Sequence, residues 1–195
     1  EYIGCKYSVA VCNGTAALDL AVNVLNMKPG SEIITTPFTF VADTNCIIYN
    51  GIKPVFADIK KDTYNIDPSE IRKKITDKTK AIIYVDYAGQ PCDIKQLKEI
   101  ADEFGLFLIE DACHALGAEL EDKKAGNFAD ITVFSFHPVK HMTTGEGGML
   151  ATNNEEFANK LRMLRNHGIQ KDIMKSHSKE AGWEYDIRHL GKNYR

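Results

Sequence analysis

Short apolar runs alternate with longer amphipathic segments along almost the whole chain. Runs such as AIIYVD at 81–86 and LFLIED at 106–111 contain few polar residues and are typical of strands that are buried on both faces. The runs that predict strands are residues 6–12, 32–36, 54–59, 81–86, 106–111, 131–136 and 149–152.

The segments between these runs carry apolar residues at helical spacing. In NGTAALDLAVNVLNM, for example, Ala17, Leu18, Ala21 and Val24 recur every three to four residues, and the Pro-Gly pair at 29–30 marks the end of the helix. The segments that predict helices are residues 13–27, 40–49, 67–75, 93–105 and 154–165. Strands separated by helices indicate an α/β fold with a mainly parallel sheet and helices on both faces, which makes three layers.

Charge and cysteine content narrow the classes of partner. The chain has 24 Lys and Arg against 27 Asp and Glu, a net charge of -3, and its basic residues are scattered, so nothing favours nucleic acid or an anionic membrane surface. No apolar run has the length of a membrane span. The five cysteines form no CxxC pair, which favours reduced thiols in a cytoplasmic protein.

Asn13-Gly14-Thr15-Ala16 joins the first expected strand to the first expected helix. Glycine allows a ligand to approach the backbone, and the start of a helix offers free N–H groups and the positive end of the helix dipole. This combination suits a phosphate group. A plain helix cap with small residues for packing explains the same four residues equally well.

Glu110-Asp111-Ala112-Cys113-His114 follows the apolar run LFLI. Acids at the end of a buried strand are costly unless they meet a cation, so we expect a positively charged partner here. A structural aspartate that caps a turn is the alternative. Zinc ligation by nearby Cys and His side chains has little support, because their spacing fits no tetrahedral zinc signature, and no metal is expected.

Lys140 lies in FSFHPVKHMTTGEGGML, between an expected strand and a glycine cluster. The cluster lacks the Gly-Lys-Ser/Thr ending of a Walker loop, and the chain has neither a G-x-G-x-x-G after its first strand nor a G-x-S-x-G. A lone loop lysine is usually a solvated cation. A phosphate cradle, an acid at a strand end and a loop lysine together are, however, what pyridoxal phosphate requires, since the lysine forms a Schiff base and the acid pairs with the pyridinium nitrogen.

The ordered motifs resemble those of the DegT/DnrJ/StrS-type sugar aminotransferases, a family of fold-type-I pyridoxal-phosphate enzymes. The resemblance runs nearly end to end, and VDYAGQ and SFHPVKHMTTGEGG look most like the pseudaminic-acid branch. The blocks that carry it are NGTAALDLA, EIITTPFTFVADTN, GIKPVFADI, DTYNID, KTKAIIYVDYAGQPCDI, IEDACHALGA, FSFHPVKHMTTGEGGML and LGKNYR.

The resemblance implies a fold, a reaction and its substrates. It implies the large domain of a fold-type-I transferase and a transaminase that moves an amino group from L-glutamate to C4 of a UDP-linked 4-keto-6-deoxy-N-acetylhexosamine, with ping-pong kinetics through pyridoxamine phosphate, for surface-glycan biosynthesis in the cytoplasm. Lys140 would hold the cofactor and shuttle protons, and Asp111 would keep the pyridinium nitrogen protonated. A dTDP- or GDP-linked keto sugar, or a non-catalytic cofactor-binding relative, is the alternative. The sugar 3-dehydratases of the family have histidine where this chain has Lys140.

The resemblance also implies how the cofactor is held. His114 would lie beside it and Phe40 would stack on its ring. The residues implied to bind its phosphate are Gly14, Thr15, Ala16 and Ser135. Asn193 looks like the asparagine that reaches the phosphate of a neighbouring subunit, which implies a homodimer with a shared active site.

Family members carry further chain at both ends. We therefore expect residues 1–169 to be the cofactor-binding large domain without its first segment. Residues 170–195 are expected to be a loop, weakly periodic from 170 to 182, and the start of a connection to a C-terminal small domain that this sequence does not contain.

Overall fold

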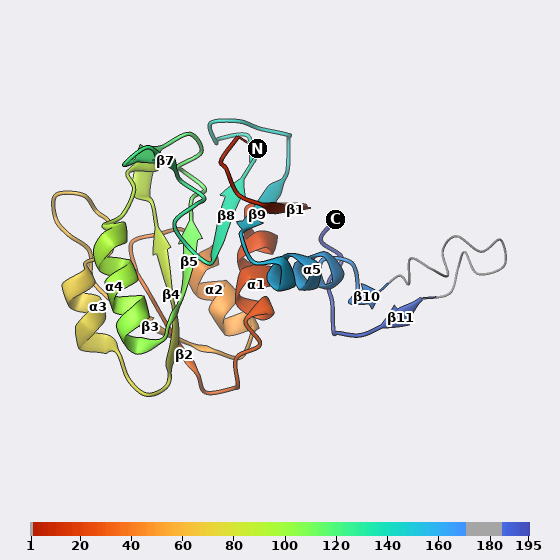
Figure 1. Cartoon of the computed structure of the whole chain (residues 1–195), viewed down its shortest axis with the longest axis horizontal. Helices are drawn as coiled ribbons and strands as arrows, with labels where there is room; N and C mark the ends of the chain where they lie inside the picture. The colour runs from red at the N-terminus through yellow and green to blue at the C-terminus, as the bar shows by residue number, and fades with distance from the viewer. Residues whose placement is uncertain (1, 171–184) are drawn as a thin grey trace.

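A computed structural model describes residues 2–170 and 185–195, and a seven-stranded sheet lies at its centre (Figure 1). The strand order is β1-β9-β8-β5-β4-β2-β3. β9 runs antiparallel to β1 and β8, and the remaining neighbours are parallel, so the predicted mainly parallel sheet is confirmed. The strands are β1 (Tyr7–Val11), β2 (Glu32–Thr35), β3 (Lys53–Phe56), β4 (Thr79–Val85), β5 (Phe107–Asp111), β8 (Ile131–Ser135) and β9 (Gly148–Thr152).

Helices cover both faces of this sheet, as the alternation of elements predicts (Figure 1). One face carries α1 (Gly14–Val24), α2 (Ala42–Tyr49) and α5 (Glu155–Leu164), and the other carries α3 (Pro68–Lys74) and α4 (Ile94–Phe104). Successive residues of the central strands enter opposite cores: Ile83 and Ile109 face α1, whereas Ile82 and Leu108 face α4. The central strands are buried on both sides for this reason, and their sequences are continuously apolar.

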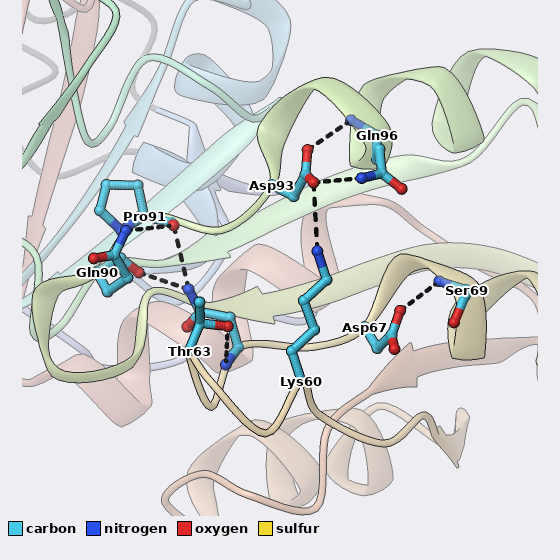
Figure 2. Close-up of polar contacts among 9 residues, drawn as sticks. Lys60, Thr63, Asp67, Ser69, Gln90, Pro91, Asp93 and Gln96 are labelled. Atoms are coloured by element: carbon cyan, nitrogen blue, oxygen red, sulfur yellow. Dashed lines mark hydrogen bonds and ion pairs between the residues drawn. The ribbon is translucent and has the colours of Figure 1, made fainter.

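Side-chain caps begin several helices where the sequence places them. Figure 2 shows the Asp67 carboxyl accepting a hydrogen bond from the Ser69 amide at 2.8 Å, and Asp93 doing the same for Gln96 at 3.3 Å. Lys60 crosses from the β3–α3 loop to Asp93, with 3.5 Å between its Nζ and the carboxylate oxygen. The Lys60–Asp93 pair thus joins the β3–α3 loop to the start of α4.

The structure differs from the expected elements at the ends of two of them and in several very short elements. α2 begins at Ala42 instead of residue 40. β3 ends at Phe56 instead of residue 59, and Ile59 pairs with Ile66 in an isolated bridge. Very short elements have too few residues to show a periodicity, and the sequence does not predict them. They are η1 (Tyr87–Gly89), β6 (Glu119–Leu120), β7 (Lys123–Lys124), β10 (Ile169–Gln170) and β11 (Asp186–Ile187).

Three other expectations concern the loop, the cysteines and membranes. The loop expected at 170–182 lies, beyond Gln170, outside the described residues. All five cysteines lie within them and are free thiols, two of them buried and three half-buried. Among the described helices, none has the length and apolar character needed to cross a bilayer.

Candidate active site

A cavity of about 710 Å³ opens where the carboxyl ends of β4, β5 and β8 meet the start of α1. Ligands of open α/β sheets bind at this edge. The wall combines backbone turns, aromatic rings and ionisable groups from segments that are far apart in the sequence. It consists of Asn13, Gly14, Thr15, Leu18, Pro37, Phe38, Thr39, Phe40, Ala42, Val85, Tyr87, Asp111, Cys113, His114, Ser135, His137, Val139, Lys140 and Glu146.

The turn between β1 and α1 presents backbone N–H groups to this cavity. The side chain of Asn13 satisfies one of the N–H groups that have no intrahelical partner at the start of α1: its Oδ1 accepts from Ala16 at 2.8 Å. The Asn13 carbonyl accepts the first intrahelical hydrogen bond, from Ala17, at 3.2 Å. The amides of Gly14 and Thr15 remain, and both residues line the cavity. A Cβ on Gly14 would lie 3.0 Å from the Ser135 Cβ, so glycine keeps this corner open between the two.

Glycines of the TTGEGG cluster are needed for packing. β9 passes so close to the β1–α1 turn that a Cβ on Gly148 would overlap the carbonyl of Asn13 and lie 2.8 Å from the Gly14 nitrogen. A Cβ on Gly147 would overlap the Thr144 hydroxyl. The glycine cluster therefore allows the turn that faces the cavity to pack against the end of β9.

Asp111 ends β5 with its carboxyl at the cavity, and only 6% of the residue is exposed. Its Oδ1 accepts a hydrogen bond from the Cys113 amide at 3.0 Å. His114 follows in the same turn, half-buried, and burial together with the charge of Lys140 lowers its pKa. This imidazole is therefore neutral at neutral pH and can both donate and accept a hydrogen bond.

The two acids at the end of β5 point to opposite faces of the sheet, and neither meets a cationic side chain among the described residues. None of the ion pairs between described residues includes Glu110 or Asp111. Each acid instead contacts another carboxyl: Asp111 contacts Asp43 of α2, and Glu110 contacts Asp86 after β4. Burial and the neighbouring carboxyl raise the pKa of Asp43 and that of Glu110.

Lys140 lies in the turn after β8, across the cavity from α1. The turn is held by the Lys140 amide, which donates to the His137 carbonyl at 2.9 Å, and by the Ser135 hydroxyl, which accepts from the His137 amide at 3.3 Å. The Lys140 side chain is half-buried, and its charge acts on both His114 and Cys113. The lysine and the acid singled out from the sequence thus share one cavity.

Aromatic rings form a further part of the cavity wall. Phe40 is 72% exposed at its edge. Phe38 and Tyr87 lie with ring centroids 4.8 Å apart, and Tyr87 also contacts the His114 ring at 6.3 Å. Sequence reasoning did not identify Phe38 or Tyr87, although TPFTF and VDYAG place an aromatic residue soon after a buried strand.

The structure brings most of the sequence-predicted site residues together. Ala16 does not line the cavity, because it is buried under the turn and its amide donates to Asn13. Asn193 is exposed and pairs with Asn166 in an isolated bridge, away from this cavity. The predicted residues that do line the cavity are Gly14, Thr15, Phe40, Asp111, His114, Ser135 and Lys140.

Curated relatives match the chain along nearly its whole length. An uncharacterized protein of Methanocaldococcus jannaschii is 50% identical over 194 residues, which is 100% of this chain and 50% of the relative. The spore coat polysaccharide biosynthesis protein SpsC of Bacillus subtilis is 42% identical, over 97% of this chain and 49% of its own length. The GDP-perosamine synthase of Vibrio cholerae is 41% identical, over 87% of this chain and 46% of its own length. The chain thus spans about half the length of these relatives.

Solved structures superpose on the same region. PseC of Helicobacter pylori, an aminotransferase involved in the biosynthesis of pseudoaminic acid, aligns with a TM-score of 0.91 and 36% identity, covering 100% of this chain and 50% of its own. Spr1654 of Streptococcus pneumoniae, described as a putative sugar aminotransferase, was solved in a PMP form and in a PLP form. The PMP form aligns with a TM-score of 0.91 and 33% identity, covering 98% of this chain and 53% of its own. These neighbours confirm the fold-type-I α/β class and the cofactor expected for the family.

The sequence profile of the DegT/DnrJ/EryC1/StrS aminotransferase family matches residues 1–195. The motifs that line the cavity, the mainly parallel sheet and the relatives agree with this match. The chain belongs to the DegT/DnrJ/EryC1/StrS aminotransferase family.

Proposed function

We propose that this chain is the cofactor-binding domain, within residues 1–169, of a pyridoxal-phosphate-dependent nucleotide-sugar aminotransferase. The enzyme would take an amino group from L-glutamate and transfer it to C4 of a UDP-linked 4-keto-6-deoxy-N-acetylhexosamine. The observation that carries this proposal is the meeting of Lys140 and Asp111, distant in sequence, at one cavity beside the free amides of α1.

The residues present fit the cofactor. Its phosphate requires donors in a space that no side chain fills, and the Gly14 corner provides N–H groups beside the Ser135 hydroxyl. Its pyridinium nitrogen requires a buried acid, and Asp111 is the acid of the cavity wall that is almost fully buried. Its carbonyl requires an amine, and Lys140 is the lysine of this wall.

Each group of the chain then has a defined task. The bound cofactor supplies an electron sink that allows a proton to leave the carbon bearing the amino group. The Lys140 amine would hold the cofactor and would take up and return that proton. Asp111 would hold the ring nitrogen, and Phe40 would lie against the ring. The imidazole of His114 would lie beside the cofactor without adding charge.

The substrate is the finer part of the proposal. A keto sugar for glycan biosynthesis is supported by PseC, which is involved in the biosynthesis of pseudoaminic acid, and by SpsC, a spore coat polysaccharide biosynthesis protein. The resemblance to the pseudaminic-acid branch supports a UDP-linked sugar. A different nucleotide is the second candidate, since the GDP-perosamine synthase of Vibrio cholerae is nearly as similar as SpsC. A cytoplasmic location is in keeping with the five free thiols.

A homodimer with a shared active site is also proposed. Asn193 is exposed and lies apart from the cavity of its own chain, so it is free to reach the phosphate site of a second copy. Phe40 and Val139 leave large apolar surface at the cavity edge, 72% and 78% exposed, which a partner subunit would cover.

Trapping the cofactor tests this function. Purified protein that is incubated with pyridoxal phosphate and reduced with borohydride should carry a phosphopyridoxyl group, the label, on Lys140. Peptide mass spectrometry locates this label. Adding L-glutamate without sugar should release 2-oxoglutarate once per site and change the visible absorbance, because the two half-reactions are separate. A panel of UDP-, dTDP- and GDP-linked 4-keto sugars should then show turnover with the UDP-linked N-acetyl sugar.

Variants make the test specific. Lys140→Ala should lose the label and at least about 10³-fold of the turnover, since no other group holds the cofactor and moves the proton. Lys95→Ala, which changes an exposed lysine of α4, is the matched control and should behave as wild type. Label on another lysine, or normal turnover by Lys140→Ala, would refute the assignment.

A further inference from the structure

Asp43 is a second carboxyl at the Asp111 site, and the cofactor chemistry described above does not use it. It lies in the first turn of α2, directly after cavity residue Ala42, and is 0% exposed. Its Oδ2 accepts a hydrogen bond from the hydroxyl of Thr39 at 2.6 Å, whereas its Oδ1 has no N–H or O–H donor among the described residues. A buried carboxylate oxygen without a donor is costly, so this atom requires an explanation.

The neighbour that explains it is Asp111, whose carboxyl is close enough to raise the pKa of Asp43 through its charge and through a side-chain hydrogen bond. Two carboxylates have no hydrogen between them, and their charges repel, so the contact is favourable only when one of the two carries a proton. A single proton would both satisfy Asp43 and leave one negative charge at the pair.

The surroundings place that proton on Asp43. Asp43 is the more deeply buried acid, while Asp111 accepts a hydrogen bond from the Cys113 amide and reaches the cavity. Burial and the Asp111 charge raise the pKa of Asp43 well above its ordinary value. The first turn of α2 favours an anion, but this effect is weaker than removal of a carboxylate from water next to a second carboxylate.

The other titratable groups around Asp43 do not supply a positive charge. Cys46, one turn further along α2, donates its thiol to the Asp43 carbonyl, and Cys113 lies on the Asp111 side. The pKa of both thiols is raised by burial and by the nearby acids, so both are neutral. No described Lys, Arg or His forms an ion pair with Asp43.

We propose that Asp43 is a neutral carboxylic acid that donates a hydrogen bond to Asp111 and so holds this carboxylate, as an anion, toward the cofactor. Asp43 is a positioning residue, because it acts through Asp111 and does not line the cavity itself. The part of the inference in which Asp43 holds Asp111 toward the cofactor rests on the proposed function. The part in which Asp43 carries the proton between the two acids does not depend on the proposed function.

Asparagine distinguishes this role from others. Asp43→Asn keeps the shape of the side chain, can donate to Asp111 through its amide and is never an anion. Asp43→Ala removes both the group that donates a hydrogen bond to Asp111 and the shape of the side chain. Asp86→Asn is the matched control, since it changes another fully buried acid that does not line the cavity.

The first readout is binding of pyridoxal phosphate, measured by titration of the visible absorbance of the bound cofactor across a range of pH. Asp43→Asn should bind with nearly wild-type affinity and the same pH profile. Asp43→Ala should bind about 10-fold or more weakly and shift the pH profile of the absorbance, because a hydrogen bond to a charged group is lost. Asp86→Asn should leave binding and profile unchanged.

The second readout is the infrared difference spectrum of wild type minus Asp43→Asn, recorded without cofactor at neutral pH. It should contain the carbonyl stretch of a protonated carboxylic acid. A carboxylate band in its place would overturn the proposal. This measurement needs only two folded proteins and still decides the question if Asp43→Ala does not fold.

The remaining outcomes separate the two proposals. If Asp43→Ala binds the cofactor as wild type does, or if Asp43→Asn is as impaired as Asp43→Ala, Asp43 does not act as a neutral donor. If wild type itself fails to bind pyridoxal phosphate, the proposed function is refuted, and the infrared spectrum still tests the protonated pair.

Discussion

Replacing Asp86 by asparagine should remove much of the pH dependence of stability near neutral pH. Asp86 and Glu110 are both 0% exposed on the α4 face of the sheet, and their side chains contact each other. Asp86 accepts a hydrogen bond from the Cys92 amide at 3.0 Å, and Glu110 accepts from the Thr132 hydroxyl at 2.6 Å. One oxygen of each acid has no donor among the described residues, which indicates a shared proton.

The magnitude follows from the pKa of Asp86, which burial raises to about 6. An unfolded aspartate has a pKa of about 4, so the folded protein binds this proton more tightly by about 3 kcal/mol. That contribution to the free energy of unfolding is full below about pH 4 and is lost as the pH rises through about 6. The pKa of Glu110 is raised as well, by burial first, so the direction is the same for both acids.

The assay is urea unfolding of wild type and Asp86→Asn at several pH values between 5 and 8. Asparagine resembles the protonated acid at every pH. The free energy of unfolding of the variant, relative to that of wild type, should therefore rise by about 1.4 kcal/mol from pH 5 to pH 8, because about half of the ~3 kcal/mol is already lost at pH 5. Titrating groups that do not contact Asp86 cancel in the difference between the two proteins. Asp77→Asn, which changes an exposed acid in a turn, is the control and should show no such trend. A difference that stays constant over this range would refute the shared proton.

Two further predictions concern the cavity. Gly148→Ala should lower the free energy of unfolding by about 1–3 kcal/mol and weaken pyridoxal-phosphate binding, because the new methyl group overlaps the Asn13 carbonyl and displaces the β1–α1 turn. Thermal unfolding measures the first effect and cofactor titration the second. Unchanged values would show that β9 can move aside. The His114 ring should titrate by NMR below the ordinary value of about 6.5 and move upward in Lys140→Ala, because that variant removes one of the charges that lower its pKa; a midpoint above 6.5 in wild type would contradict the burial and charge described here.

Secondary structure could be predicted well because its signals are local. Caps such as Asn13, Asp67, Asp93 and Asn154 begin helices where the sequence indicates, since each cap needs only an amide two or three residues away. The failures are elements of two or three residues, such as β6 and β7, whose formation depends on a turn at Glu121 and Asp122 with positive φ.

The site could be predicted in part for a related reason. Motifs that follow parallel strands must meet at one edge of the sheet, so the gathering of Gly14, Asp111 and Lys140 could be foreseen from their places after strands. The aromatic wall of Phe38 and Tyr87 was missed, because side chains in loops take their direction from neighbours that the local sequence does not reveal.

The identity of the elements, the two-sided burial of the central strands and the chemistry available at their ends are therefore already present in the order of residues, because backbone hydrogen bonds and side-chain alternation are short-range. Which acids meet was decided by folding. Asp43 and Asp111 come from different elements, as do Asp86 and Glu110, and only the packing of α2 and β4 around β5 brings each pair together. A carboxyl changes from a charged partner of cations to a neutral donor when it is buried beside another carboxyl, and that burial is a property of the tertiary structure.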